Sequence, residues 1–204
     1  MWQTLKYIAT GCLLACCALF TTAQGNDFDP YTVEIEENIK YPAVPSKLKE
    51  TVVHAMNKLE RTLSNDNKYE CSRVRSGEVV VVTIPCSMLF QPNSTQLKSS
   101  AEKVLQPLLP YIKRTDRYKV IVAVHSDDTG DSEYADNLTA ERATAIDEYY
   151  YTKNDNNDTC IIPYGLGADE PLKPNTSVDG RAANRRVEVY FVPTKEYIEI
   201  LKRK

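Results

Sequence analysis

One short polar loop follows an apolar run in a way that is typical of a ligand site. Residues 118–125 (YKVIVAVH) are β-branched and apolar enough to form a buried strand, and residues 124–130 (VHSDDTG) close it. Ligands of open α/β sheets tend to bind at the carboxyl ends of strands. The two acids, the glycine and the small hydroxyl residues therefore indicate a polar binding loop, although a plain turn with a helix cap would use the same residue types.

Catalytic chemistry at this loop is not favoured. His125 stands beside Asp127 and Asp128, but no serine or cysteine nucleophile motif, second histidine or metal-ligand spacing accompanies them. We expect His125 to fix the loop by hydrogen bonds, and the isolated His54 to have an ordinary surface or packing role. The sequence thus favours a binding protein that is not an enzyme and has no metal or cofactor.

The elements that would position this loop alternate between strand and helix. An amphipathic helix is expected over 46–64, and Pro107 and Pro110 should kink or break the helix expected over 94–113. The strands are expected at 69–75, 78–85, 118–125, 159–166 and 186–192, and a further helix at 132–151. This order predicts an α/β two-layer sandwich, a βαβαββ-type mixed sheet with helices packed on it, preceded by an N-terminal helix.

Three ordered motifs carry a resemblance to a known family. The loop at 125–130 is followed by residues 138–143 (LTAERA) and, far downstream, by residues 180–189 (GRAANRRVEV). Residues 89–94 (LFQPNS) and 164–167 (YGLG) add weaker matches. Over roughly residues 78–192, this pattern resembles the OmpA-like C-terminal domain family, whose members bind peptidoglycan.

The resemblance implies a set of site residues. In that family the loop aspartate and the arginine of the next helix bind the diaminopimelate of a peptidoglycan stem peptide, and the matching positions are Asp127 and Arg142. An aspartate would accept the ammonium of diaminopimelate, and an arginine would clamp its carboxylate. Asn93 is expected as a third contact. Arg185 and Arg186 match the family's arginine pair, although one of them could be a buried partner for an acid, and Asp127 with Arg142 could instead form a structural ion pair.

The sequence departs from the family pattern beside this expected site. Val124 replaces the usual glycine before the histidine, Ala135 stands where asparagine is frequent, and Glu141 where a second arginine is common. Because all three neighbour the expected pocket, affinity or ligand choice could differ from that of the family. The amides at 131–134, at the start of the helix, are expected to add donors for an anion.

The first 23 residues are typical of a secretory signal peptide. Lys6 supplies a positive charge, residues 7–20 are almost all apolar or small, and residues 21–23 (TTA) offer a cleavage site before Gln24. The alternatives are a lipobox that ends at Cys16 and, less favoured because the apolar run is short, a membrane span. In an oxidising compartment Cys71, Cys86 and Cys160 could form one disulfide, or all three could be buried thiols.

The expected organisation has five parts. They are a signal peptide at 1–23, an extended acidic segment at 24–45, a helix and short strand at 46–75, the OmpA-like domain at 76–193 and a short basic helix or tail at 194–204. The net charge of −3 gives no reason to expect a nucleic acid partner.

The functional expectation is non-catalytic binding of peptidoglycan in the periplasm of a Gram-negative bacterium. The partners would be the stem peptide and outer-membrane proteins, and the chain would tether or organise the cell envelope. The alternative is an envelope scaffold that has the same fold but does not bind the wall. In that case the helix at 46–64 would dock on another protein through exposed apolar residues.

Overall fold

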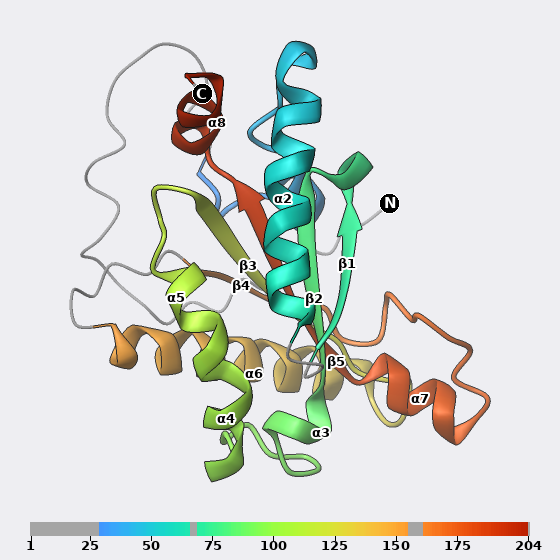
Figure 1. The fold of residues 1–204 in the computed structure, drawn as a ribbon. Helices are drawn as coiled ribbons and strands as arrows, with labels where there is room; N and C mark the ends of the chain where they lie inside the picture. Colours follow the sequence, from blue (N-terminus) through green and yellow to red (C-terminus); the bar gives the residue numbers. More distant parts are fainter. Residues whose placement is uncertain (1–28, 66–68, 155–160, 204) are drawn as a thin grey trace.

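The molecule is built on a five-stranded mixed sheet, shown in Figure 1. The computed structural model describes residues 29–65, 69–154 and 161–203. The strands are β1 (Glu70–Val74), β2 (Val79–Pro85), β3 (Tyr118–Val124), β4 (Ile161–Gly165) and β5 (Arg186–Pro193). Their order is β1-β2-β5-β3-β4, in which only β3 and β4 run parallel. The predicted mixed α/β sheet is confirmed.

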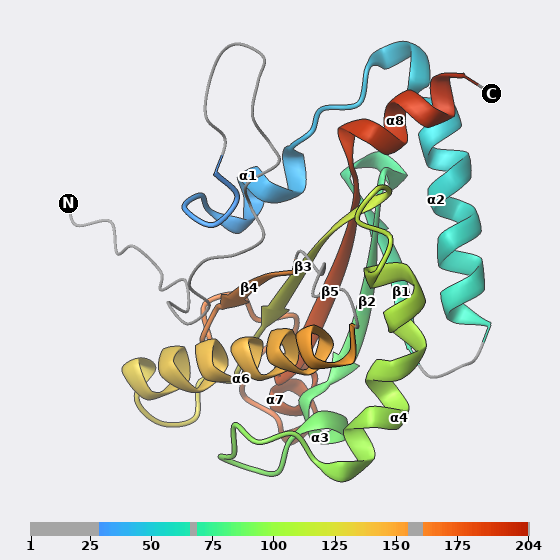
Figure 2. The ribbon, with the colours of Figure 1, turned by 90° about the vertical axis from the view of Figure 1, so that its left-hand side faces the viewer.

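Both faces of the sheet are covered, which explains why its central strands are apolar at nearly every position. Helix α2 (Lys49–Ser64) and helix α6 (Ser132–Lys153) share one apolar core with the sheet face that they cover, and α8 (Lys195–Lys202) joins that core. Figure 2 shows α1 (Ile35–Lys40) on the side of the sheet away from α2. In α2 the side chains of Val52, Met56, Leu59 and Leu63 are buried, as the helical spacing predicts.

The helix expected over 94–113 begins only at residue 99, and at the prolines it changes between α and 3-10 geometry instead of running straight. After α3 (Cys86–Leu89), the chain forms a continuous helical run: a 3-10 turn at Ser99–Ala101, α4 (Glu102–Leu105), a 3-10 turn at Gln106–Leu108 and α5 (Leu109–Ile112). A proline has no amide hydrogen and its ring clashes with the preceding turn, so Pro107 and Pro110 cannot continue one straight helix. The buried side chains of Leu105, Leu108 and Ile112 still present one apolar side to the core.

The expectation of an extended segment at 24–45 is wrong where the structure describes it. Helix α1 lies within this segment, with Ile35 buried and Ile39 packed against the same apolar cluster on the second face of the sheet. Asn38 is fully buried, and its amide donates to the Tyr164 hydroxyl at 2.5 Å. Lys119 of β3 donates to the carbonyl of Asn38 at 2.6 Å. A helix of fewer than two turns is too short to show a sustained apolar period, so the sequence pattern missed it.

Several expectations concern residues outside the described ranges. The signal peptide, the alternative lipobox and residues 24–28 fall there, as does Cys160. Cys71 and Cys86 are free thiols. Within the residues that are described, no helix has both the length and the apolar character needed to cross a membrane.

Candidate ligand site at one end of the sheet

The sheet topology brings the candidate residues to one end of the molecule. Because β5 runs antiparallel to β3, Val124 at the end of β3 pairs with Val187 near the start of β5. The amide of His125 then donates to the carbonyl of Arg186 at 2.9 Å. The amide of Cys86, just after β2, donates to the carbonyl of Arg185 at 3.0 Å. The loop after β3, the start of β5 and α3 therefore meet at the same edge.

Asp127 is a buried carboxylate with two partners. One oxygen accepts the Thr129 amide at 3.0 Å, and the other forms an ion pair with the Arg185 guanidinium. Burial raises the pKa of the Asp127 carboxyl, but the Thr129 amide and the Arg185 guanidinium outweigh this effect, so the pKa lies below its usual value. Asp127 is therefore a fixed negative charge at neutral pH.

Arg142 is held by the turn that follows α3. Its Nε donates to the carbonyl of Ser94 at 2.8 Å, and its Nη2 donates to the carbonyl of Gln91 at 3.2 Å. Its guanidinium also lies 4.9 Å from the centre of the Phe90 ring. Asn93 is exposed in this turn, with a left-handed φ of 55° that asparagine tolerates. Arg142 and Asn93 are thus parts of one small unit, and the expected alternative of an Asp127–Arg142 ion pair is not observed.

The buried thiol of Cys86 marks where the arginines converge. Its Sγ lies 3.9 Å from the carbonyl oxygen of His125. Burial raises the pKa of Cys86 to about 11, and the positive charges of Arg142, Arg185 and Arg186 oppose that rise. All three guanidinium groups therefore lie within electrostatic reach of one sulfur atom. Composition and spacing gave no sign that this cysteine lies beneath the site.

Arg186 is the buried structural member of the arginine pair. Its Nε donates to a carboxylate oxygen of Glu188 at 2.6 Å, and its side chain is only 4% exposed. Burial would raise the pKa of Glu188, but the His125 ring, the Tyr190 hydroxyl and the Arg186 guanidinium hold it at about 2. Arg186 is therefore placed as a partner of an acid, which was the alternative left open by the sequence.

The hydrogen bonds expected of His125 come from its backbone and not from its ring. The ring is buried, and neither of its nitrogen atoms has a hydrogen-bond partner among the described residues. Its Nε2 lies 3.6 Å from a carboxylate oxygen of Glu188, beyond hydrogen-bond length. His125 instead fixes the loop through its backbone amide, as described above.

Other residues that build the site lie within the quoted motifs at 138–143 and 164–167, but the sequence assigned them no role. The Thr139 hydroxyl of α6 accepts the amide of Gly167 at 3.0 Å, and the carbonyl of Gly167 accepts the amide of Ser126 at 2.6 Å. A side chain at Gly165 would place its Cβ 2.3 Å from the amide nitrogen of Ala140, so only glycine allows α6 to lie this close to β4. These contacts fix the ligand loop against the helix that carries Arg142.

The loop before α7 (Val178–Asn184) depends on one buried amide. The Asn184 side chain donates to the carbonyl of Lys173 and to the side-chain oxygen of Asn175, both at 2.7 Å, and accepts the Lys173 amide at 3.0 Å. This pins residues 173–175 to the helix that ends directly before Arg185. The motif at 180–189 therefore contains a structural asparagine as well as the arginines.

The expected free amides at the start of α6 are partly used by the chain itself. The carboxylate of Asp131 accepts the amide of Glu133 at 3.3 Å as a helix cap. Of the departures from the family pattern, Val124 and Ala135 are buried, whereas Glu141 is exposed on α6. The side chain of Glu141 is therefore exposed to solvent, although Glu141 directly precedes Arg142 in the sequence.

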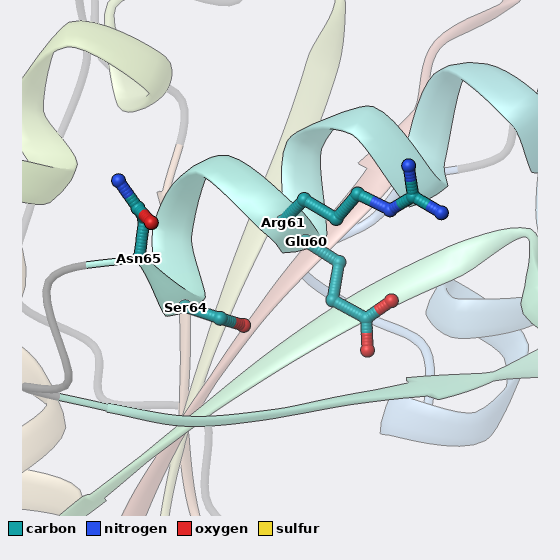
Figure 3. Close-up of a pocket in the computed structure, with 4 residues that line it drawn as sticks. All are labelled: Glu60, Arg61, Ser64 and Asn65. Carbon is teal, nitrogen blue, oxygen red and sulfur yellow. The ribbon is translucent and has the colours of Figure 1, made fainter.

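A separate hollow lies on α2 and does not coincide with this site. Figure 3 shows the residues that line it, Glu60, Arg61, Ser64 and Asn65, all from the last turns of that helix and its end. Glu60 is already paired with Arg73 at 2.8 Å. The hollow brings together no residue of the β3–α6 loop or of the arginine motif.

Comparison with known proteins finds a family match for the region that contains this end of the sheet. Residues 89–185 match the model of the OmpA family, and this range contains Asp127, Arg142 and Arg185. "Probable lipoprotein YiaD" of Escherichia coli is 28% identical over 122 residues, which cover 60% of this chain and 55% of that protein. "Peptidoglycan-binding protein ArfA" of Mycobacterium bovis is 30% identical over 100 residues, which cover 49% of this chain and 30% of that protein. The chain thus covers 55% of the length of the first relative and 30% of the length of the second.

Solved structures share the fold. A protein of Desulfovibrio vulgaris described as MotB-like covers 71% of this chain and 95% of its own, with 23% identity and a TM-score of 0.60. The cell wall anchor of the T6SS from Pseudomonas aeruginosa covers 66% of this chain and 96% of its own, with 21% identity and a TM-score of 0.55. The ordered motifs and the match over residues 89–185 agree: this region of the chain is similar to the OmpA family, and the solved structures share its fold.

Proposed function

We propose that this domain binds peptidoglycan non-covalently by gripping the diaminopimelate of a stem peptide. The single observation that carries the proposal is the placement of a fixed anion, Asp127, and a fixed cation, Arg142, on neighbouring elements at one end of the sheet. The name of the mycobacterial relative, a peptidoglycan-binding protein, supports the same ligand class.

The chemistry of the ligand fits these two charges. The side chain of diaminopimelate ends in a carbon that carries both an ammonium and a carboxylate. Asp127 accepts the ammonium, and Arg142 donates to the carboxylate. A guanidinium has five N–H donors, and the two carbonyls of the turn at 91–94 use two of its nitrogen atoms, so donors remain for a ligand. Asn93, exposed in the same turn, is a third contact.

The cellular setting belongs to the same proposal. The relatives include lipoproteins and outer-membrane proteins, "Outer membrane porin F" of Pseudomonas aeruginosa among them. We place the chain in the periplasm, with the cell wall as its partner. Removal of residues 1–23 leaves attachment to the outer membrane to other proteins, whereas the alternative, lipidation at Cys16, would keep residues from Cys16 onward and anchor the chain directly. In this setting the domain tethers envelope components to the wall and performs no reaction.

The scaffold alternative is not supported by the surface of α2. Its large apolar residues are buried apart from the half-buried Val53, and its exposed positions include His54, Lys58 and Arg61. The exposed large apolar residues of the described ranges lie on other elements; they are Val74, Met88, Tyr134, Tyr151, Leu172 and Val178. A docking role for residues 46–64 therefore lacks the apolar face that it would need.

The test is co-sedimentation of the purified chain with diaminopimelate-type peptidoglycan. The wild type should sediment with the wall, and Asp127→Asn should lose most of the bound fraction. Arg142→Lys keeps the charge but loses the planar fork, so it should also bind weakly. Lysine is preferable to alanine here because Arg142 also holds the turn at 91–94.

A matched control is available at the opposite end of β3. Arg114 and Asp116 form an ion pair through two contacts of 2.8 Å, and the Arg114 side chain is 42% exposed. Asp116→Asn should leave sedimentation unchanged. Far-UV circular dichroism and thermal unfolding confirm that every variant is folded, and a folded wild type that stays in the supernatant would refute the proposal.

A further inference from the structure

Without a ligand, the Asp127 carboxylate of the candidate site is already paired with a cation of the protein itself, Arg185. The Asp127 side chain is only 5% exposed and pairs with the guanidinium of Arg185, whereas the Arg185 side chain is 43% exposed. An incoming ammonium therefore meets a carboxylate that is already neutralised. Arg185 must therefore leave Asp127 before the ammonium can bind there.

The backbone of Arg185 is fixed, but its side chain has room to move. Its amide donates to the carbonyl of Arg181 at 3.1 Å, and its carbonyl accepts the amide of Cys86 at 3.0 Å. The neighbouring Arg186, by contrast, is 4% exposed and joined to Glu188. Arg185 can therefore change partner by side-chain rotation alone, without any movement of α7 or β5.

The net charge of the site determines which terminal groups of a ligand the site can bind. Asp127 contributes one negative charge, and Arg142 and Arg185 contribute two positive charges. A bare ammonium that takes over Asp127 would leave both guanidinium groups without a counter-charge. A zwitterionic end brings a carboxylate with it and leaves the net charge unchanged.

We propose that Arg185 is the exchangeable counter-ion of the site and its specificity-determining residue. The ligand ammonium replaces the guanidinium at Asp127, and the released guanidinium joins Arg142 on the ligand carboxylate. The exchange favours stem peptides with a free diaminopimelate carboxylate over those with lysine, or with an amidated diaminopimelate, at the same position. This inference rests on the proposed function and adds its selectivity.

The test is isothermal titration of the purified chain with two soluble stem tetrapeptides, one with diaminopimelate and one with lysine at the third position. The wild type should bind the diaminopimelate peptide at least about tenfold more tightly. In Arg185→Gln the competitor for Asp127 and the second carboxylate donor are both gone. The lysine peptide should therefore bind more tightly, the diaminopimelate peptide more weakly, and the ratio should fall to about threefold or less.

Two further variants make the result specific to this residue. Arg185→Lys retains a cation but not the planar fork, and its ratio should lie between those of the wild type and Arg185→Gln. Arg114→Gln, which removes an arginine of equal exposure at the other end of β3, should leave the ratio unchanged.

The outcomes separate this inference from the proposed function. Binding of the diaminopimelate peptide with an unchanged ratio in Arg185→Gln would overturn the exchange and leave peptidoglycan binding intact. Equal affinity of the wild type for both peptides would also overturn it. If the folded wild type bound neither peptide, the proposed function would fail, and this inference with it.

Discussion

Two adjacent arginines at the start of β5 form two ion pairs with opposite characters. Arg186 and Glu188 have side chains that are 4% and 11% exposed, and Tyr190 also donates to Glu188. Arg185 and Asp127 are 43% and 5% exposed, and the Arg185 guanidinium lies at the surface. The pair of Arg186 and Glu188, here called the inner pair, has the surroundings of a structural bond. The pair of Arg185 and Asp127, the outer pair, has those of a bond that a ligand can exchange. The same residue type in one motif thus serves two purposes.

The largest difference between the pairs should appear when the inner arginine is removed. Arg186→Met leaves the Glu188 carboxylate buried without its cation, so the free energy of unfolding should fall by about 3 kcal/mol. Urea unfolding at pH 7, followed by circular dichroism, measures this loss. A loss below about 1 kcal/mol would mean that the inner pair is not a structural bond.

The dependence of the unfolding free energy on acid pH should also report on the pair of Arg186 and Glu188. The Glu188 carboxyl has a pKa of about 2 in the folded protein and an ordinary value of 4.5 when unfolded, so between these values the unfolded state binds the extra proton. Stability from this group is present above about pH 4.5 and is lost as the pH falls toward 2. Glu188→Gln should flatten the fall in unfolding free energy over that window. The Asp127 pKa is also lowered, so Asp127→Asn should flatten the fall further, through the outer pair.

A half-buried carboxyl, that of Asp147, provides the contrast to both pairs. Burial, with the charge of Glu148, raises the pKa of Asp147 to about 6. The folded state then holds a proton that the unfolded state has released, so stability falls as the pH rises from about 4 to 6. Asp147→Asn should raise the free energy of unfolding by about 1 kcal/mol at pH 8 and have little effect at pH 4. A variant that is less stable than the wild type at pH 8 would contradict this assignment.

The smallest effect on stability is expected at the outer pair. Arg185→Gln removes a half-exposed cation, while the Thr129 amide continues to donate to Asp127. The free energy of unfolding should fall by at most about 1 kcal/mol, and by less in high salt. The same urea experiment checks this, and a loss as large as that of Arg186→Met would remove the distinction between the pairs.

Much of the fold could be predicted because its elements have clear periods. The apolar runs of β2 and β3 and the helical spacing of α2 follow directly from the need to bury both faces of the sheet. Helix α1 could not be predicted in this way, because fewer than two turns carry no period. It is stabilised by contacts from distant residues, such as the bond from Lys119 to the carbonyl of Asn38.

The motifs identified the charged residues of the site but not their partners. Asp127 and Arg142 were expected at the ligand, yet nothing in the sequence indicated that Arg142 would donate to the carbonyls of Gln91 and Ser94. Neighbouring arginines have the same intrinsic chemistry, so burial alone separates Arg185 from Arg186. Burial is set by the register of β5, which only the folded structure provides.

The most direct test of the central claim is a nuclear magnetic resonance titration of the ¹⁵N-labelled chain with a soluble diaminopimelate tetrapeptide. We expect the Thr129 amide and the side-chain resonances of Arg142 and Arg185 to shift together as ligand is added. The amides of Ser64 and Asn65, at the hollow on α2, should stay in place. Shifts confined to α2, with the loop after β3 and both arginines unaffected, would contradict the claim that this end of the sheet binds the cell wall.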